Sequence, residues 1–321
     1  MKAEMAQLVS IIIPCFNAER WVSEAIHSCL TQSYQPIEII VIDDGSTDKS
    51  LEVIKSFGDK IRWETGPNRG GNHARNRGFA LSKGEYIQFL DADDILDPKN
   101  IELQTPCLMR DQADVVVGSW RKLVENKDGS FTKESLKEIK IGPDALCSLL
   151  NSEAWAPPAS HLYKRQYVEL IGGWDESLKC LQDVRFNAEL IKHGARFMSV
   201  PHFCAYYRRP LTTTTSTRSE TLFMQACFSF HNDSQEYFDK TGWTEERVKT
   251  LTRCYGYLAR YYYEHDRAMF ERCLEKIHAL NPDYLPEGPR RLRTLSRTIG
   301  YRNAEFVALT YRKLKKCFRH L

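Results

Sequence analysis

Three carboxylates follow a short apolar run of the chain. The run Tyr86–Leu90 has the composition of a buried strand, and Asp91, Asp93 and Asp94 come directly after it. In an open α/β sheet, ligands bind at the edge where the strands end. A hard divalent cation such as Mg²⁺ or Mn²⁺ takes oxygen ligands, commonly one or two carboxylates together with phosphate oxygens. Asp91 and Asp93 are spaced so that one turn could direct both toward such an ion.

Two other interpretations of these acids compete with the metal site. Asp-x-Asp is common in ordinary turns, so the spacing alone is weak evidence. An EF-hand calcium loop that starts at Asp91 would place Glu102 at its twelfth position. However, Ile95 and Leu96 stand where that loop needs an oxygen ligand and a glycine. The EF-hand is therefore excluded, and Mn²⁺ or Mg²⁺ is the expected ion.

Strands and helices alternate along the first half of the chain. The β-branched run Leu8–Ile13 has the composition of a parallel strand that is buried on both faces. Apolar residues recur at helical spacing in Glu19–Thr31, and we expect further strands at Ile37–Ile42, Ile61–Glu64 and Asp114–Trp120. This alternation predicts an α/β fold with a mostly parallel, Rossmann-like central sheet that is flanked by helices.

Three turns that carry polar residues follow strands of this predicted sheet. Pro14–Asn17 follows the first strand, Asp43–Asp48 follows the second, and Asp91–Asp94 follows Tyr86–Leu90. Because the carboxyl ends of parallel strands meet at one edge, we expect these turns to lie together. Their convergence favours the metal-site interpretation of the aspartates.

The segment Gly66–Gly78 combines glycines with arginines. Its glycines let a backbone approach a ligand, and the start of the following helix offers N–H groups to an anion. Arg69, Arg75 and Arg77 could pair with phosphate. No Gly-Lys-Ser/Thr ends the segment, so it is not a P-loop, and the first strand lacks the Gly-x-Gly-x-x-Gly of dinucleotide-binding proteins. A flexible loop with solvated arginines remains an open alternative.

A second group of candidate residues lies between Leu170 and Arg196. The turn Gly172-Gly-Trp-Asp-Glu176 precedes a segment with apolar residues at helical spacing. Asp183 falls in the first turn of that helix, where an acid also suits the helix dipole. A capping role and a chemical role are equally open for Asp183 on this ground.

Composition and cysteine usage bound the class of protein. The chain has 321 residues, of which 42% are hydrophobic and 27% charged, and no apolar run approaches the roughly 20 residues that span a bilayer. We expect a cytoplasmic protein. Ten cysteines occur without a Cys-x-x-Cys pair, which argues against a zinc site and a disulfide framework and favours reduced thiols.

The C-terminal third has a different pattern. We expect two domains, residues 1–215 and a helical region at 216–321. Residues 290–321 carry ten Lys or Arg and one acid, hence a net charge of +9, which leaves −6 for the rest of a chain whose total is +3. Within 302–321, apolar residues recur at four- and three-residue intervals: Val307, Tyr311, Leu314, Phe318 and Leu321. This basic amphipathic helix could bind an anionic membrane or dock on the protein, and nucleic acid is not an expected partner because no recognised module accompanies the charge.

Five segments together resemble the inverting glycosyltransferases of family 2, which have a GT-A fold. The segments are Ser10-Ile-Ile-Ile-Pro-Cys-Phe-Asn17, Asp43-Asp-Gly-Ser-Thr-Asp48, Asn68 through Gly78, Phe89-Leu-Asp-Ala-Asp-Asp94 and Gly172-Gly-Trp-Asp-Glu176. Each is weak alone, but their order and spacing over about residues 8–210 are very specific. The resemblance implies a nonprocessive enzyme of polysaccharide biosynthesis. It would move a sugar from a UDP- or dTDP-sugar to a glycan, lipid-linked or protein-linked acceptor.

The resemblance also implies roles for individual residues. The residues that it implies in binding the nucleotide-sugar donor are Pro14, Phe16, Asn17, Asp43, Asn68, Gly70, Arg75 and Asp91. Asp93, with Asp91 near it, would bind Mn²⁺ or Mg²⁺ on the diphosphate, and Asp183 matches the catalytic base. Inversion requires such a base to take the proton of the acceptor hydroxyl.

The chain departs from the family pattern at two places. Gln182 stands where relatives have an acid before the base, and Arg208 and Arg209 stand where many carry a histidine near the metal. We expect Arg208 or Arg209 to bind the diphosphate instead. A nucleotidyltransferase is one alternative, although Pro14–Asn17 is not the basic glycine-rich loop that it needs. A catalytically silent, carbohydrate- or partner-binding relative is the other, supported only by Gln182.

Overall fold

The computed structural model describes residues 6–211, 219–286 and 290–317, without the side chains of Arg291 and of residues 312–317. The chain forms two compact units, Met1–Glu220 and Thr221–Leu321. The boundary predicted between residues 215 and 216 lies outside the described residues.

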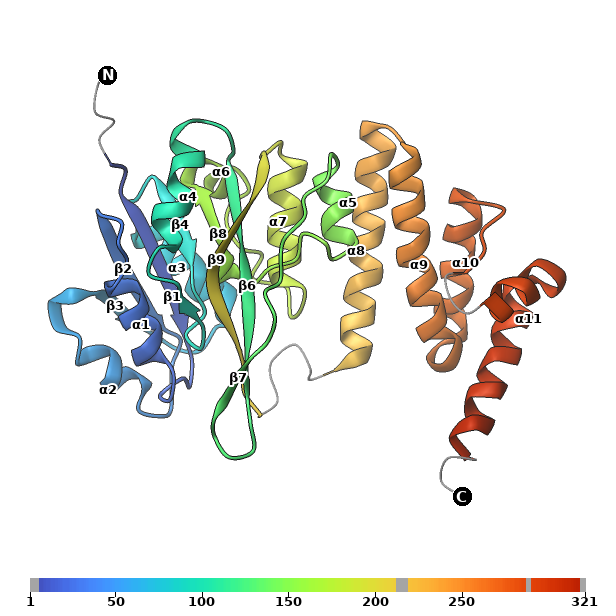
Figure 1. The fold of residues 1–321 in the computed structure, drawn as a ribbon, viewed down its shortest axis with the longest axis horizontal. Coiled ribbons are helices and arrows are strands. Elements are labelled where there is room, and N and C mark those ends of the chain that lie inside the picture. The colour runs from blue at the N-terminus through green and yellow to red at the C-terminus, as the bar shows by residue number, and fades with distance from the viewer. Residues whose placement is uncertain (1–5, 212–218, 287–289, 318–321) are drawn as a thin grey trace. The chain divides into compact units, whose positions relative to one another are not determined.

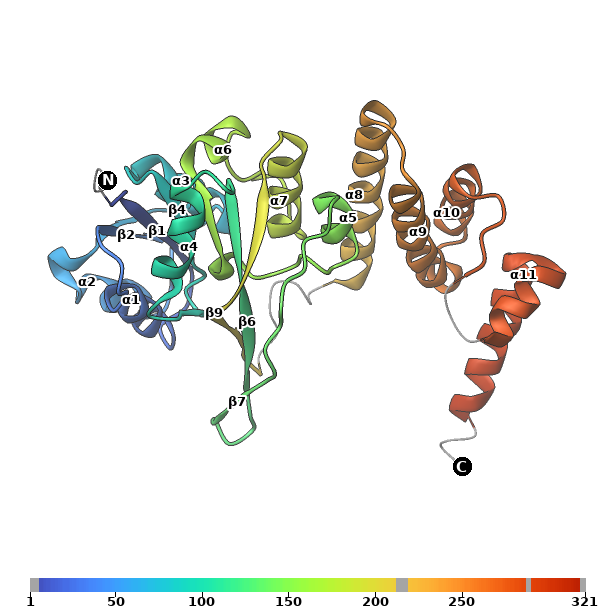
Figure 2. The same cartoon turned by 45° about the horizontal axis from the view of Figure 1, so that its top comes forward.

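The first unit is built on a nine-stranded mixed sheet (Figures 1 and 2). In chain order its strands are β1 Val9–Cys15, β2 Ile37–Asp43, β3 Arg62–Thr65, β4 Tyr86–Phe89, β5 Ile95–Leu96, β6 Val115–Glu125, β7 Phe131–Lys133, β8 His161–Lys164 and β9 Phe197–Arg209. In space the order is β3-β2-β1-β4-β8-β6-β9-β5, with β7 on β6. Strands β3, β2, β1 and β4 are mutually parallel, and β8 runs antiparallel to both β4 and β6. The predicted α/β class and Rossmann-like sheet are confirmed.

Helices cover both faces of this sheet. They are α1 Val22–Leu30, α2 Ser50–Lys55, α3 Gly71–Leu81, α4 Asn100–Met109, α5 Ala145–Leu150, α6 Arg165–Leu170 and α7 Gln182–Lys192, with short 3₁₀ turns at Gly58–Lys60 and Pro158–Ser160. Ile11 and Ile13 of β1 pack with α1, α2 and α4, whereas Ile12 packs with α6 and α7 on the other face. Helix α3 lies close to β1, since a Cβ on Gly78 would come within 2.4 Å of Ile12 Cγ2.

The register of the strands brings the polar turns together. Cys15 of β1 pairs with Asp43 of β2, and Asp43 pairs with Thr65 of β3. On the other side, Ile12 pairs with Phe89 of β4, so the aspartates after β4 emerge beside the end of β1. The expectation that the turns after β1, β2 and β4 share one edge is confirmed.

The second unit consists of helices α8 Glu220–Thr241, α9 Glu245–His265, α10 Arg267–Leu280 and α11 Arg290–Cys317. Side chains of Thr244 and Asp266 accept backbone N–H groups and cap α9 and α10. Helix α11 is kinked at Gly300, whose φ of 75° is not helical. No helix among the described residues is long and apolar enough to cross a membrane.

Candidate active site

The turns after β1 and β2 are tied to each other by polar groups. The amide oxygen of Asn17 accepts the backbone N–H of Thr47 at 2.8 Å, and the N–H of Asn17 donates to Ser46 Oγ at 3.0 Å. Asn17 has a φ of 50°, a left-handed conformation that asparagine adopts more readily than most residues. Two other predicted donor-site residues flank this link: Pro14 lies in β1, and Phe16 is 47% exposed beside it.

Two buried aspartates at the end of β2 hold the loops around them. Asp43 Oδ2 accepts a hydrogen bond from the hydroxyl of Thr65 at 2.6 Å. The two oxygens of Asp44 accept the backbone N–H groups of Arg69 at 2.9 Å and Gly70 at 2.8 Å. Asp44 therefore clamps the glycine-rich loop to β2. Sequence analysis gave Asp44 no role, although an acid between a strand end and a glycine was a signal for one.

The clamped loop carries two predicted donor-site residues. Gly45 is required here because its φ is 74° and a Cβ would lie 2.7 Å from the backbone nitrogen of Asn68. Asn68 is exposed, and Gly70, with a φ of 100°, leads directly into α3. Both residues thus lie beside Asp44 and Gly45, directly after β2.

Arg75 of α3 reaches Asp91 across the end of the sheet. Its Nη2 donates to Asp91 Oδ1 at 2.5 Å, its Nη1 donates to Asn72 Oδ1 at 3.2 Å, and its guanidinium lies 4.6 Å from the ring centre of Trp174. Arg75 is buried, whereas Asp91 is partly exposed. The helix thereby presents a positive charge to the carboxylates that follow β4.

The aspartates after β4 repel one another. Burial, and then the charge of Asp91, raise the pKa of Asp93 to about 6. Burial and the charges of Asp93 and Asp91 raise the pKa of Asp94 well above its usual range. Asp94 Oδ1 accepts the backbone N–H of Arg208 at 2.9 Å, whereas its Oδ2 is buried without a hydrogen-bond partner. This excess of negative charge suits a cation.

The residues present fit a divalent ion that is completed by other ligands. No group of three or more His, Cys, Asp or Glu side chains that could hold a metal occurs in the described part of the chain. Asp91 and Asp93 together would supply two carboxylate ligands, and Mg²⁺ typically takes one or two carboxylates beside phosphate oxygens and waters. The geometry therefore suits an ion that arrives with a diphosphate.

Arg208 and Arg209 occupy the end of β9 with different contacts. Arg208 is buried between the rings of Trp21 and Phe131, at 4.3 and 5.0 Å from their centres. Its Nε donates to the carbonyl oxygen of Asp93 at 2.7 Å, and its Nη2 pairs with Glu24 at 2.5 Å. These contacts give Arg208 a bracing role for the aspartate turn. Arg209 donates to the hydroxyl of Tyr207 at 3.1 Å and is the less committed of the two.

Asp183 lies in the first turn of α7. Its Oδ2 accepts the indole N–H of Trp155 at 3.0 Å. Burial raises the pKa of Asp183, and the negative charge of Asp91 also raises it. Hydrogen bonds from the backbone of Val184 and the side chain of Trp155 lower this pKa, as does the positive charge of Arg75. Asp183 is thus electrostatically linked to the predicted donor site. Trp155 was missed by sequence analysis because a tryptophan before Pro157 carries no motif.

A side-chain link joins α3 to the turn before Asp183, 98 residues away in sequence. Asn76 of α3 donates to the carbonyl oxygen of Trp174 at 2.8 Å and accepts the backbone N–H of the same residue at 2.7 Å. It also donates to Glu176 at 3.0 Å, and Asn72 donates to the carbonyl oxygen of Asp175 at 2.7 Å. The turn that precedes Asp183 is therefore fastened to the helix that carries Arg75.

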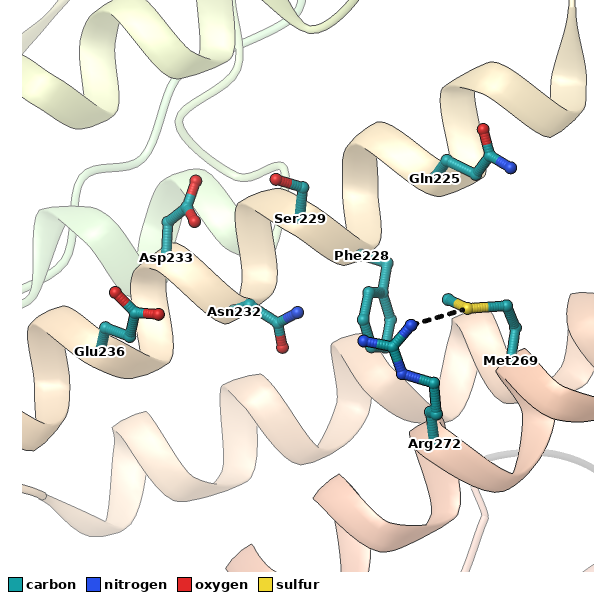
Figure 3. A pocket seen from close by; sticks show the side chains of 8 residues that line it. All are labelled: Gln225, Phe228, Ser229, Asn232, Asp233, Glu236, Met269 and Arg272. Atoms are coloured by element: carbon teal, nitrogen blue, oxygen red, sulfur yellow. Dashed lines mark hydrogen bonds between the residues drawn. The ribbon is translucent and has the colours of Figure 1, made fainter.

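A separate pocket of about 500 Å³ lies in the second unit (Figure 3). It is lined by Gln225, Phe228, Ser229, Asn232, Asp233 and Glu236 of α8 and by Met269 and Arg272 of α10. Arg272 lies over the ring of Phe228 at 5.0 Å and donates to the sulfur of Met269 at 3.5 Å. None of the residues predicted for the active site lines it.

The family model described as "Glycosyl transferase family 2" matches residues 10–171. An uncharacterized glycosyltransferase of Rickettsia typhi is 40% identical over 186 residues, which cover 55% of this chain and 56% of the relative. Glycosyltransferase GlyG of Streptococcus pneumoniae is 38% identical over 131 residues, covering 40% of this chain and 43% of GlyG. The chain thus spans about half the length of the curated relatives it matches.

Solved structures extend the likeness over nearly the whole chain. The crystal structure of S. aureus TarS in complex with UDP-GlcNAc has a TM-score of 0.64 and 18% identity, and the match covers 95% of this chain and 91% of the TarS chain. A complex of TarS with UDP gives a TM-score of 0.62 at 17% identity. At this identity the likeness bears on the fold alone, and it confirms the predicted GT-A type.

Proposed function

Because the chain belongs to glycosyl transferase family 2, we propose that it transfers a sugar from a UDP- or dTDP-sugar to a hydroxyl group of a glycan, lipid-linked or protein-linked acceptor. The observation that carries this proposal is the meeting of the turns after β1, β2 and β4 at one sheet edge, where Arg75 of α3 pairs with Asp91. Asp183 of α7 lies within the electrostatic field of both residues. The fold shared with TarS, which binds UDP-GlcNAc, supports a nucleotide-sugar as the donor.

The donor would lie along the ends of β1, β2 and β4. In this proposal, the base and ribose contact the Pro14–Asn17 turn and Asp43, while Asn68, Gly70 and Arg75 line the rest of the donor site. Arg75 offers a guanidinium to the diphosphate. Of the two arginines of β9, we assign the same role to Arg209, because Arg208 already donates to Asp93 and Glu24.

Asp93, together with Asp91, would hold Mn²⁺ or Mg²⁺. Such an ion supplies charge stabilisation to a leaving diphosphate. On the protein side, Arg75 already offsets the charge of Asp91 through their hydrogen bond, and Arg208 holds the Asp93 carbonyl in place. The metal dependence of the enzyme is part of the proposal.

Asp183 would act as the general base. Its carboxylate takes the proton of the acceptor hydroxyl while that oxygen bonds to the anomeric carbon, and the bond from this carbon to the diphosphate oxygen breaks with its electron pair leaving on the diphosphate. Attack from the face opposite the leaving group inverts the anomeric centre. The raised pKa of Asp183 suits a base that works nearer neutral pH. One sugar would be added per encounter, since the resemblance is to nonprocessive members.

Helix α11 would supply peripheral contact with an anionic membrane. Its side chains Phe306, Val307 and Tyr311 are exposed, whereas its acid, Glu305, is buried. Leu314 lies in the helix with its side chain not described, and Phe318 and Leu321 lie outside the described residues. A cytoplasmic location stays a prediction from the sequence.

Calorimetric titration of the parent protein with UDP, dTDP, GDP and CMP, each with and without Mn²⁺, tests the donor site. We expect metal-dependent binding of UDP or dTDP alone. Absence of binding by all four nucleotides would contradict the enzyme assignment and favour a silent relative that binds carbohydrate or a partner.

The base assignment has its own test in Asp183→Asn. This variant should bind the nucleotide like the parent but lose transfer by at least a hundredfold, because an amide cannot take the proton. Glu189→Gln is the matched control, as it removes another acid of α7 and should leave transfer unchanged. Transfer by Asp183→Asn at the parent rate would show that another group is the base.

A further inference from the structure

We propose that Trp155 is a positioning residue for Asp183, which holds one carboxylate oxygen of the base so that the other meets the acceptor hydroxyl. This inference rests on the proposed function. It adds to the site a residue from the segment between α5 and β8, outside the five segments that carry the family resemblance.

The geometry of the contact is specific. The indole N–H of Trp155 donates to Asp183 Oδ2 at 3.0 Å, within the normal range for a hydrogen bond between a nitrogen and an oxygen. Asp183 lies two residues after Leu181, the residue that precedes α7. Leu181 has a left-handed φ of 55°, and its side chain does not cap the helix. The orientation of the carboxylate at this helix end is therefore set in part by a residue 28 positions earlier in the chain.

The indole is itself held by other rings. Trp155 lies edge-to-face with Trp120 at 5.1 Å and with Tyr207 at 5.8 Å, and Trp120 and Tyr207 lie 5.7 Å apart in the same manner. The chain after Trp155 is stiffened by Pro157 and Pro158, whose φ angles are constrained by their rings. Trp155 thus packs in an aromatic cluster with Trp120 and Tyr207, and its contact with Tyr207 does not depend on Trp120.

An indole suits this task chemically. Its N–H donates but cannot accept a proton, so it cannot compete with Asp183 for the proton of the acceptor. It carries no charge, and it therefore stabilises the carboxylate without lowering the pKa of Asp183 as strongly as a cation would. Burial already raises the pKa of Asp183, and the N–H opposes that rise.

Trp155→Phe tests the proposal because it keeps an aromatic ring and removes the N–H. The readout is UDP release from the best donor among UDP-GlcNAc, UDP-glucose and UDP-galactose, with water as acceptor. We expect kcat to fall about tenfold or more with little change in the donor KM, since a misplaced base affects the chemical step. The acidic limb of the pH profile should move to higher pH, because loss of the donor raises the pKa of Asp183.

Trp120→Phe is the matched control in the same aromatic cluster. The Nε1 of Trp120 is buried without a hydrogen-bond partner, so this change disturbs the packing but removes no bond to the base. It should leave the pH profile in place. Equal shifts in both variants, or none in Trp155→Phe, would overturn the positioning role and leave only packing.

A second measurement does not require turnover. The ¹⁵N-labelled indole resonance of Trp155, assigned as the peak that Trp155→Phe lacks, should titrate with the protonation of Asp183 and cease to titrate in Asp183→Asn. If the chemical shift of this indole signal does not change with pH in the parent, the proposal is contradicted even when the enzyme is active. If this signal titrates while no nucleotide binds and no UDP is released, the proposed function fails and the contact itself stands.

Discussion

Three carboxylates after β4 carry more negative charge than their protein partners offset. Arg75 pairs with Asp91, and the Arg208 backbone N–H reaches Asp94, but burial and repulsion still raise the pKa of Asp93 and Asp94. Acids with perturbed pKa values cluster at functional sites, although structural ion pairs also perturb pKa values. In this protein the residues whose charges disfavour folding are the same ones that we propose to hold a cation.

Asp93→Asn should therefore stabilise the protein without metal at pH 8. The native state binds the Asp93 proton more tightly than the unfolded chain does, so the parent loses stability as pH rises from about 4 through about 6. A neutral amide removes that loss, on the order of 1–3 kcal/mol at pH 8 and less at pH 5. Urea unfolding at both pH values, with EDTA present, measures the difference.

The same variant should bind UDP no better with Mn²⁺ than without it. Asp97→Asn is a suitable control, because Asp97 belongs to the same segment but accepts a backbone N–H from Lys99 at the start of α4, as an asparagine can. It should behave like the parent in both measurements. An Asp93→Asn protein that is less stable at pH 8 would mean that its carboxylate is satisfied rather than strained.

Sequence patterns predicted some residues of the site and not others. Asp91, Asp93 and Asp183 could be found because acids at strand and helix ends have a recognisable spacing. The indole of Trp155 could not, because its partner lies 28 residues away and only the fold brings the two together. The bracing role of Arg208 was also unpredictable, since its surroundings come from α1, the β6–β7 hairpin and the turn after β4.

At the scale of elements, α3 and the Gly172–Glu176 turn act as one piece. Asn76 binds both backbone groups of Trp174, and Trp174 in turn stacks on Phe186 of α7 with ring centres 4.1 Å apart. The helix that carries Arg75 and the helix that carries Asp183 are thus joined through the turn. Movement of the turn should change the distance between Arg75 and Asp183, the proposed donor-binding residue and the proposed base.

Gly173→Ala should break this junction, and Gly172→Ala should not. Both glycines have positive φ, 82° and 73°, so each alanine costs about 1–2 kcal/mol of backbone strain. Only at Gly173 would the new Cβ meet Asn76 Oδ1, at 2.6 Å, and displace its bond to Trp174. Gly173→Ala should therefore be less stable than Gly172→Ala by a further ~1–2 kcal/mol in urea unfolding.

A double-variant cycle checks the cause of this difference. In an Asn76→Ala background the clash partner is gone, so the extra cost of Gly173→Ala should vanish. If the extra cost persists without Asn76, then strain within the turn, and not the contact with α3, explains it.

The order of the strands shows the limit of element prediction. Strands β1, β2, β4 and β6 lie in apolar or β-branched runs, and these four strands and the short strand β3 were predicted. Strand β8, only four residues long after Pro157-Pro158, has no comparable run, yet it lies between β4 and β6 and runs antiparallel to both. Its place depends on pairing with strands distant in sequence, which local patterns do not encode.

At the scale of the whole molecule, charge is divided unevenly along the chain. Residues 290–321 carry +9, and the remainder carries −6. Part of α11 is fixed within the second unit, since Tyr301 lies against Phe270 and Arg302 pairs with Glu271. Phe306 and Tyr311 stay about 60% exposed, which leaves an apolar surface on a basic helix. The helix therefore combines partial docking with a face that suits a lipid surface.

Lys313, Lys315 and Lys316 provide the test of membrane contact. Replacing all three with Gln should weaken binding to vesicles of phosphatidylcholine with 30% phosphatidylserine by tenfold or more, because each basic residue near an anionic surface contributes about 1 kcal/mol. Replacing Lys60, Lys99 and Lys127, three exposed lysines of the first unit, changes the net charge equally and should have little effect. Binding of the parent should fall in 0.5 M NaCl and be absent on phosphatidylcholine alone, since screening removes the charge attraction. Equal loss in both triple variants would indicate a net-charge effect, and no binding by the parent would show that α11 is a docked helix with a solvated basic face.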